Sequence, residues 1–198
     1  MNTARKFRSA DRLSVDEYLA FIARRPSAER WQLIDGVAIM LTPPTLRHQT
    51  VARNLMVDLN VHFRIKNLPF SALQEVGLIV PDVAQFRPAC DVAVVDTSID
   101  LDSSFADRFF LVAEVLSPSS TEDDVELKRT RYLQHPDNLY CLIISQSEFK
   151  VEVWTRASGW QCQTLTDLDD VVALPTWDFT ANLADIYLNT RVGKRKRA

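Results

Sequence analysis

The sequence predicts a single mixed α/β domain. Short runs rich in β-branched and aromatic residues alternate with longer segments whose apolar residues recur at helical spacing. The length of 198 residues, of which 46% are hydrophobic, suits one sizeable core and is short for two. Only four glycines occur, and none lies in a run that could cradle a phosphate, which excludes P-loop and dinucleotide-binding folds.

The N-terminal region predicts a helix followed by a β-hairpin. Ser14 can cap the helix, and Glu17, three positions later, completes a capping box. Two short apolar runs within residues 31–41 then surround the dipeptide Asp35-Gly36. This dipeptide supplies the positive φ angles of a tight hairpin turn, so we expect the two runs to pair.

The rest of the chain alternates predicted helices and strands. The longest helix is expected over residues 45–66, where Val51, Leu55, Leu59 and Phe63 recur at four-residue steps. Two further helices are expected over residues 121–134 and 181–188. Sheet strands are expected in residues 70–80, 92–95 and 109–116, and a three-strand meander in residues 139–144, 150–156 and 160–165.

The charge balance argues against a surface that binds polyanions over its whole area. Lys plus Arg number 23 and Asp plus Glu 26, a net charge of −3, so any nucleic-acid contact must come from local basic patches. The three cysteines are an odd number without C-x-x-C spacing, which favours a reducing cytoplasm without disulfides or zinc. Because no stretch of 18 apolar residues and no signal-like N-terminus occur, we expect a cytoplasmic protein that is not bound to a membrane.

Two carboxylates are expected inside the sheet. Glu114 interrupts an otherwise apolar run, residues 109–116, which is typical of a strand covered on both faces. Asp91 begins the apolar strand of residues 92–95. A charge buried alone is costly, so a cation, a metal ion or a raised pKa must compensate it. Adjacent strands could place the two carboxylates side by side, which suits a divalent metal ion.

Lys128 is the predicted third member of this cluster. It lies three residues after Val125 and four before Tyr132, so it shares the helix face that turns toward the sheet. The two acids could hold Mg²⁺ while the lysine orients an attacking water or neutralises charge that develops on the phosphate. This chemistry is metal-assisted hydrolysis of a phosphodiester. On the residues alone, a buried ion-pair network that only specifies packing is an equally good interpretation.

Six segments of the sequence carry a resemblance to a known family. They are Trp31-Gln32-Leu33-Ile34-Asp35-Gly36, Thr42-Pro43-Pro44, Arg47-His48, Asp91-Val92-Ala93-Val94-Val95, Glu114-Val115-Leu116-Ser117-Pro118-Ser119, and Lys128 with Tyr132. In these segments, and over residues 13–187, the chain resembles the Uma-type family of bacterial restriction-endonuclease-like proteins. The resemblance implies the PD-(D/E)XK nuclease superfamily, whose fold is a central mixed sheet flanked by helices and whose members cut DNA with Mg²⁺.

The resemblance also implies roles for individual residues. Asp91 and Glu114 correspond to the metal ligands, and Lys128 corresponds to the catalytic lysine. The lysine is then displaced from the strand position now held by Leu116 to the helix that follows.

Two positions depart from the family pattern. Cys90 precedes Asp91 in place of the proline that names the motif, while a literal Pro81-Asp82 lies upstream. We prefer Asp91 because it begins the longer apolar strand. Gln32 stands where the family usually has a glutamate. If that acid binds metal in the family, the expectation here is a weaker site or a site for a single metal ion.

His48 and several basic residues are secondary candidates. His48, near the start of the long helix, could act as a general base or contact a phosphate, but a histidine that only bonds to the backbone is equally consistent. Some basic residues of the predicted helices could contact phosphates, although most suit a solvated face: Arg47, Arg53, Arg64, Lys66, Arg129 and Arg131. The basic cluster at residues 194–197 could attract DNA or only favour solubility.

The sequence thus predicts one restriction-endonuclease-like domain over residues 13–190, between a flexible segment 1–12 and a basic disordered tail 191–198. The expected function is that of a Mg²⁺-dependent endodeoxyribonuclease, with Mn²⁺ as a substitute, acting on double-stranded DNA as a homodimer. One alternative is a catalytically inactive nuclease-like module that binds DNA or a protein, which Gln32 and the acidic balance favour. Another is hydrolysis of RNA by the same residues.

Overall fold

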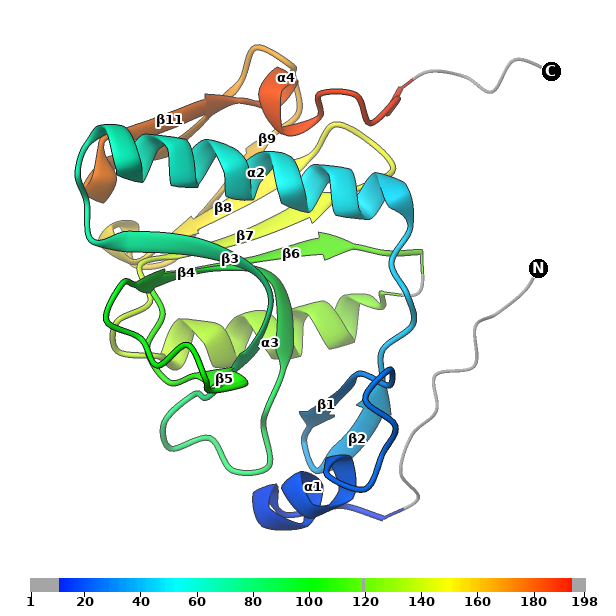
Figure 1. The fold of residues 1–198 in the computed structure, drawn as a ribbon. Coiled ribbons are helices and arrows are strands. Elements are labelled where there is room, and N and C mark those ends of the chain that lie inside the picture. The colour runs from blue at the N-terminus through cyan, green and yellow to red at the C-terminus, as the bar shows by residue number, and fades with distance from the viewer. Residues whose placement is uncertain (1–10, 119, 194–198) are drawn as a thin grey trace, which may run out of the picture.

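The computed structural model describes residues 11–118 and 120–193, which form a seven-stranded mixed sheet with helices on both faces (Figure 1). The helices are α1 (Val15–Ile22), α2 (Leu46–Ile65), α3 (Glu122–Gln134) and α4 (Leu183–Ile186), with 3₁₀ turns η1 (Arg156–Ser158) and η2 (Pro175–Trp177). The strands are β1 (Trp31–Ile34), β2 (Val37–Met40), β3 (Phe70–Leu78), β4 (Ala89–Asp96), β5 (Phe105–Ala106), β6 (Leu111–Leu116), β7 (Tyr140–Ser145), β8 (Val151–Thr155), β9 (Gln161–Leu165), β10 (Val171–Leu174) and β11 (Phe179–Asn182). The basic cluster at residues 194–197 and residues 1–10 of the N-terminal segment lie outside the described residues.

The central sheet has the strand order β5-β3-β4-β6-β7-β8-β9. β6 and β7 are parallel and connected through α3, so they form a βαβ unit. β7, β8 and β9 form an antiparallel meander, and β4 pairs antiparallel with both β3 and β6. The mixed α/β class and the central mixed sheet flanked by helices, as expected from the sequence, are confirmed.

Helices α2 and α3 cover opposite faces of this sheet (Figure 1). The core between α2 and the sheet contains the apolar residues that recur at four-residue steps, Val51, Leu55, Leu59 and Phe63. On the opposite face, Tyr132 of α3 packs in a cluster with Phe86 and Phe109. The sheet is therefore buried on both faces in its centre, which is why β4 and β6 are written as nearly continuous apolar runs.

The N-terminal helix and hairpin form a separate layer beside the sheet (Figure 1). The capping box at Ser14 is present, and β1 and β2 pair through a turn in which Asp35 (φ 46°) and Gly36 (φ 80°) are left-handed, as expected. Leu33 of β1 exchanges two backbone hydrogen bonds with Arg87 (2.8 and 2.9 Å), which anchors the hairpin to the segment that leads into β4.

The C-terminal region differs from the expectation. Of the helix expected over residues 181–188, only α4 forms, because residues 179–182 pair with β10 as strand β11. Side chains in β10 and β11 alternate between buried and exposed, so strand periodicity prevails over the helical pattern. Strand β5 was not predicted either, because its two residues carry too short a pattern to recognise.

The three cysteines are free thiols in different strands. Cys90 in β4 and Cys141 in β7 are buried, and Cys162 in β9 is exposed. Among the residues that the structure describes, no helix combines the length and hydropathy needed to cross a membrane.

His135, directly after α3, has one ring nitrogen committed as an acceptor. Its Nδ1 accepts the backbone N–H of Asp137 (3.1 Å), so its Nε2 carries the proton and donates to the carbonyl of Asp107 (3.0 Å). Burial lowers the pKa of His135 below its ordinary value, because a charged ring would be poorly solvated there. Protonating Nδ1 would also break the hydrogen bond from Asp137.

We therefore expect the free energy of unfolding to decrease as the pH falls below about 6.5, because the unfolded histidine then binds a proton that the folded one rejects. Urea titrations from about pH 8 to about pH 5 should show a shallower pH dependence for His135→Gln than for the wild type. Identical slopes for the two proteins would contradict the prediction.

Candidate active site

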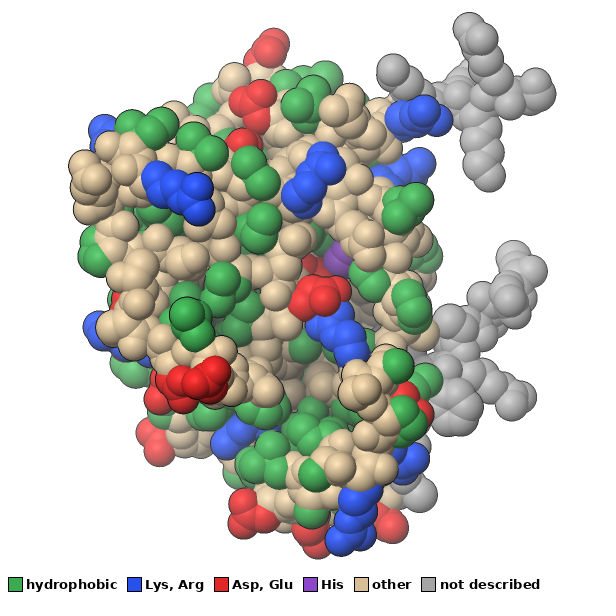
Figure 2. All heavy atoms as spheres, viewed as in Figure 1, with side chains coloured by type: hydrophobic (Ala, Val, Ile, Leu, Met, Phe, Trp, Pro, Cys, Tyr) green, Lys and Arg blue, Asp and Glu red, His purple; other side chains and the backbone are tan. Residues whose placement is uncertain are grey.

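A cleft of about 660 Å³ opens where β4 and β6 diverge. The β4–β6 ladder ends at the pair Val92↔Ala113, so Asp91 and Glu114, which would form the next pair, are no longer joined by the backbone. Both line the cleft, together with the β1–β2 hairpin and the start of α3. Figure 2 shows acidic and basic side chains gathered beside a hollow between the body of the sheet and the N-terminal layer.

Asp91 lies at a break in the side-chain alternation of β4. Cys90 and Ala93 both belong to the core on the α3 side, whereas Val92 belongs to the core on the α2 side, so the alternation expected of a regular strand fails at Asp91. The Oδ2 atom of Asp91 accepts the backbone N–H of Val115 of β6 at 2.6 Å. Its carboxylate thus takes the place of the missing ladder pair beside Val115.

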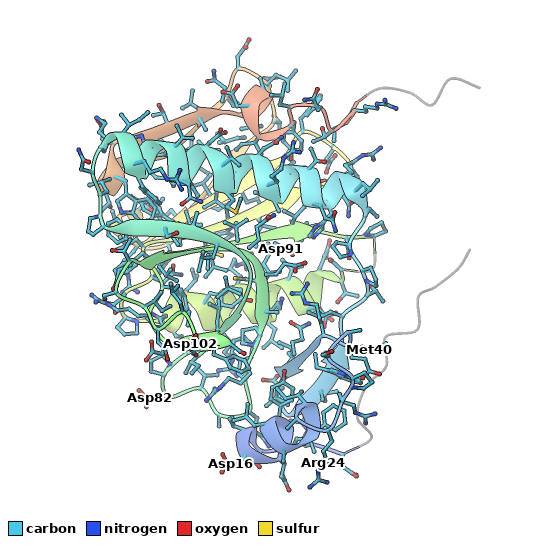
Figure 3. The ribbon with its side chains drawn as sticks, viewed as in Figure 1. Asp16, Arg24, Met40, Asp82, Asp91 and Asp102 are labelled. Atoms are coloured by element: carbon cyan, nitrogen blue, oxygen red, sulfur yellow. The ribbon has the colours of Figure 1, made fainter. Side chains whose placement is uncertain are left out.

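Asp82, the aspartate of the literal Pro81-Asp82, is exposed in a turn and does not line the cleft. Figure 3 shows Asp82 at the outer edge of the molecule and Asp91 near its centre. The structure therefore brings Asp91, and not Asp82, next to Glu114.

Glu114 is held by two side chains of α3. Its Oε1 accepts hydrogen bonds from Lys128 Nζ (2.8 Å) and from the Tyr132 hydroxyl (2.6 Å). Lys128 Nζ also donates to the carbonyl of Ala89 at the start of β4 (2.9 Å). Only 14% of the side-chain surface of Glu114 and of Lys128 is exposed. The spacing of Lys128 and Tyr132 on α3 thus places both donors on one carboxylate oxygen.

The surroundings of the cluster favour the charged form of Lys128 and disfavour the charged form of Glu114. Burial raises the pKa of Glu114, and although Lys128 opposes that effect, Asp91 adds to it, so the net shift is upward. Burial would lower the pKa of Lys128, but the Glu114 and Asp91 carboxylates raise it above its ordinary value. Burial also raises the pKa of Tyr132, which keeps its phenol protonated as a hydrogen-bond donor.

His48 is placed by α2 against Asp91. Its backbone N–H donates to the capping hydroxyl of Thr45, and its Nε2 lies 3.2 Å from Asp91 Oδ2. Burial would lower the pKa of His48, but its hydrogen bond to Asp91, the Asp91 charge and the Val115 backbone raise it in total. The ring is therefore engaged with the Asp91 carboxylate and with the Val115 backbone, whereas the backbone N–H of His48 belongs to the helix cap. In this arrangement His48 orients Asp91.

Two glutamines support the walls of the cleft, and one of them, Gln146, was not predicted from the sequence. Gln32 is buried in β1, and its Oε1 accepts the backbone N–H of Ala89 at 3.4 Å. Gln146, which follows β7, is 4% exposed and donates to the carbonyl of Leu116 (2.8 Å) while it accepts the hydroxyl of Thr45 (2.6 Å). A polar residue directly after an apolar strand parallel to β6 is the signal that could have identified Gln146.

Several of the basic residues considered for phosphate contacts have partners within the chain. Arg47 Nε donates to the carbonyl of Thr190 (3.2 Å), and the Arg129 guanidinium lies 4.1 Å from the ring centroid of Trp154. Lys66 is paired with Asp178 (2.8 Å).

The donor set fits a magnesium ion that is only partly enclosed by protein. Within residues 11–118 and 120–193, no hydrogen bond reaches Asp91 Oδ1 or Glu114 Oε2, so each carboxylate keeps one oxygen without a partner. No group of three or more His, Cys, Asp or Glu in those ranges could hold a metal ion by itself. Mg²⁺ is commonly bound by one or two carboxylates, with water and phosphate oxygens as the other ligands.

We expect Lys128→Met to lower the free energy of unfolding by about 3 kcal/mol in EDTA at neutral pH, because it leaves the Glu114 carboxylate buried without a cation. The loss should be smaller at acidic pH, where Glu114 is protonated. Urea denaturation measures both effects.

The matched control is the double variant Glu114→Gln/Lys128→Met, which removes both charges and should recover much of the lost stability. If Lys128→Met alone were as stable as the wild type, Glu114 would not depend on this amine for its burial.

Comparisons with known proteins agree with this architecture. A family model described as "Uma2: Putative restriction endonuclease" matches residues 15–184. The crystal structure of a "putative nuclease belonging to DUF820 from Anabaena variabilis ATCC 29413" has the same fold, with a TM-score of 0.73 and 15% sequence identity over 88% of this chain and 97% of that chain. No curated protein matches the chain. The family match spans most of the chain, which therefore belongs to the Uma2 family.

Proposed function

We propose that the protein is a Mg²⁺-dependent endonuclease that hydrolyses phosphodiester bonds of double-stranded DNA in this cleft. The observation that carries the proposal is the convergence of Asp91, Glu114 and Lys128 from β4, β6 and α3 at the point where the two strands separate. Membership of the Uma2 family supports a nuclease activity.

Asp91 and Glu114 would hold the metal ion, each through the oxygen that accepts no hydrogen bond from the described residues. When bound there, Mg²⁺ supplies Lewis-acid polarisation of the scissile phosphate and makes a water molecule easier to deprotonate. A backbone carbonyl near Val115 is a further candidate ligand, since this residue lies beside Glu114 in the lining of the cleft. Water and phosphate oxygens would complete the coordination.

The protein's own groups orient the reactants and balance charge. The Lys128 ammonium, fixed between Glu114 and the carbonyl of Ala89, can donate a hydrogen bond to the attacking water or to a phosphate oxygen on which negative charge develops. Tyr132 restrains Glu114, and the Val115 N–H with His48 restrains Asp91. These contacts exist without substrate, so little reorganisation is needed when it binds.

A second candidate function is a catalytically inactive module that binds DNA or a protein. Its support is Gln32, a neutral amide on the wall of the cleft, which leaves the site with fewer acids than the family pattern. Metal binding separates the two functions.

We also propose that the active form is a homodimer, because cutting both strands of a duplex suits two-fold symmetry.

The first experiment is nicking of a supercoiled plasmid in Mg²⁺ or Mn²⁺. The wild type should nick the plasmid, and Asp91→Asn and Lys128→Ala should lower the rate by at least about 100-fold, because each removes a group that stabilises charge in the transition state. Asp82→Asn is the matched control and should retain the wild-type rate. Equal rates in all four proteins would indicate a contaminating nuclease, and cleavage of labelled RNA but not of plasmid would reassign the substrate.

The second experiment is calorimetric titration with Mn²⁺ in the absence of DNA. The wild type and Asp82→Asn should bind the ion, whereas Asp91→Asn and Glu114→Gln should each lose most of the binding heat, since one carboxylate alone is a poor site. A wild type that binds no Mn²⁺ would favour the inactive module.

A further inference from the structure

Glu75 lies opposite Asp91 at a second break in the sheet. In the β3–β4 ladder, Gln74 pairs with Val92, and the next position, Glu75 against Asp91, is left out before pairing resumes. Glu75 has a φ of 59°, in the left-handed region that residues other than glycine rarely adopt. Backbone conformations of this kind occur in turns and also at active sites and ligand-binding segments.

The Glu75 carboxylate forms an ion pair with Arg30, whose Nη1 contacts Glu75 Oε1. Arg30 directly precedes β1, so the pair joins the N-terminal hairpin to β3 at the edge of the cleft, which both residues line. Their side chains are 39% and 48% exposed. Ion pairs this exposed contribute little to stability and can exchange partners.

Arg30 is the accessible cation of the cleft. Arg30 and Lys128 are the arginine and lysine residues that line it within the part of the chain that the structure describes. Lys128 is committed to Glu114 and is only 14% exposed. With a net charge of −3 over the whole chain, attraction of a polyanion must come from such local groups.

Glu75 also stands where the cleft meets a second hollow of about 570 Å³. Four residues line both hollows: Pro44, His48, Glu75 and Asp91. The second hollow continues along α2 past Gln49 and Arg53. A nucleic-acid strand that places a phosphate at Asp91 and extends through both hollows therefore passes the Glu75 carboxylate.

We propose that Arg30 is a phosphate-binding residue of the substrate cleft and that Glu75 occupies it in the free protein. Bound DNA would exchange the Arg30–Glu75 ion pair for a contact between Arg30 and a backbone phosphate. A guanidinium fits a phosphate as well as it fits a carboxylate, because both accept two parallel hydrogen bonds. The proposal rests on the proposed function, since it takes nucleic acid as the ligand of the cleft.

The exchange makes Glu75 a competitor of the substrate. A weakly bound anion cannot displace the Glu75 carboxylate from Arg30, and the negative charge of Glu75 repels it. A nucleic acid, in contrast, offers several phosphates along its path and releases counterions when it binds. Glu75 thus discriminates against small or weakly charged anions that would otherwise enter the cleft.

The test is fluorescence anisotropy of a labelled short duplex in EDTA, where the DNA stays intact, at several salt concentrations. Glu75→Gln should bind about twofold to fivefold more tightly than the wild type, because the competing charge is gone. Arg30→Gln should bind more weakly. The slope of log K against log salt should become shallower by about 1, which corresponds to the loss of one phosphate contact.

The matched controls are Asp102→Asn and Arg24→Gln, which make the same charge changes at exposed positions outside the cleft lining (Figure 3). Both should bind as the wild type does. If Arg24→Gln weakened binding as much as Arg30→Gln, the effect would be one of net charge, and the proposal would be overturned. Thermal denaturation of each variant establishes that it is folded.

The double variant Arg30→Gln/Glu75→Gln separates occupation of Arg30 from simple repulsion. If Glu75 acts by occupying Arg30, its removal should tighten binding less when Arg30 is absent. Fully additive effects would refute the exchange. If the wild type binds and nicks DNA while these variants change nothing, only this inference fails; if the wild type neither binds nor nicks DNA, the proposed function fails with it.

Discussion

A carboxylate in the middle of a buried strand must be paired, and in this protein the pairing of Glu114 with Lys128 determines how the site is built. The two head groups are 2.8 Å apart, and Tyr132 shares the same carboxylate oxygen. Lys128 and Tyr132 both come from α3, so the βαβ crossover must place that helix against the sheet face to which the Glu114 side chain points. An unpaired buried charge would be costly, so the helix must carry a lysine where it faces Glu114, and Glu114 lines the cleft.

The second determinant is the failure of the backbone ladder beside that pair. Regular pairing stops between β4 and β6 at Asp91, and it skips the same residue between β3 and β4. The backbone N–H of Val115 is satisfied by the Asp91 carboxylate instead of a neighbouring strand. A side chain thus replaces a ladder hydrogen bond, which explains how a gap can exist in the centre of a sheet without leaving a donor unpaired.

Local signals were sufficient to predict much of the fold. The capping box at Ser14, the Asp35-Gly36 turn and the four-residue apolar spacing of α2 each depend on residues close in sequence. The β10–β11 hairpin was missed because no Asp-Gly turn joins its four-residue strands, and because the end of β11 falls within the apolar pattern expected as a helix over residues 181–188.

The candidate site could be predicted where burial makes a charge conspicuous and not where geometry alone matters. Asp91, Glu114 and Lys128 stand out because charged residues interrupt apolar strands or an inward helix face, and the structure brings all three to one cleft. Arg30 and Glu75 gave no such signal, because both are exposed and meet only through tertiary contacts. A left-handed glutamate in a strand has no sequence signature at all.

The lysine's place on α3 has a consequence for β6. The position two residues after Glu114 need not carry an amine, and Leu116 fills it with a side chain that packs against the apolar cluster on the α3 side. The residues of β6 before and after Glu114 are therefore all apolar. These apolar surroundings exclude water from the Glu114 carboxylate. The low local polarisability then strengthens its attraction to the Lys128 ammonium.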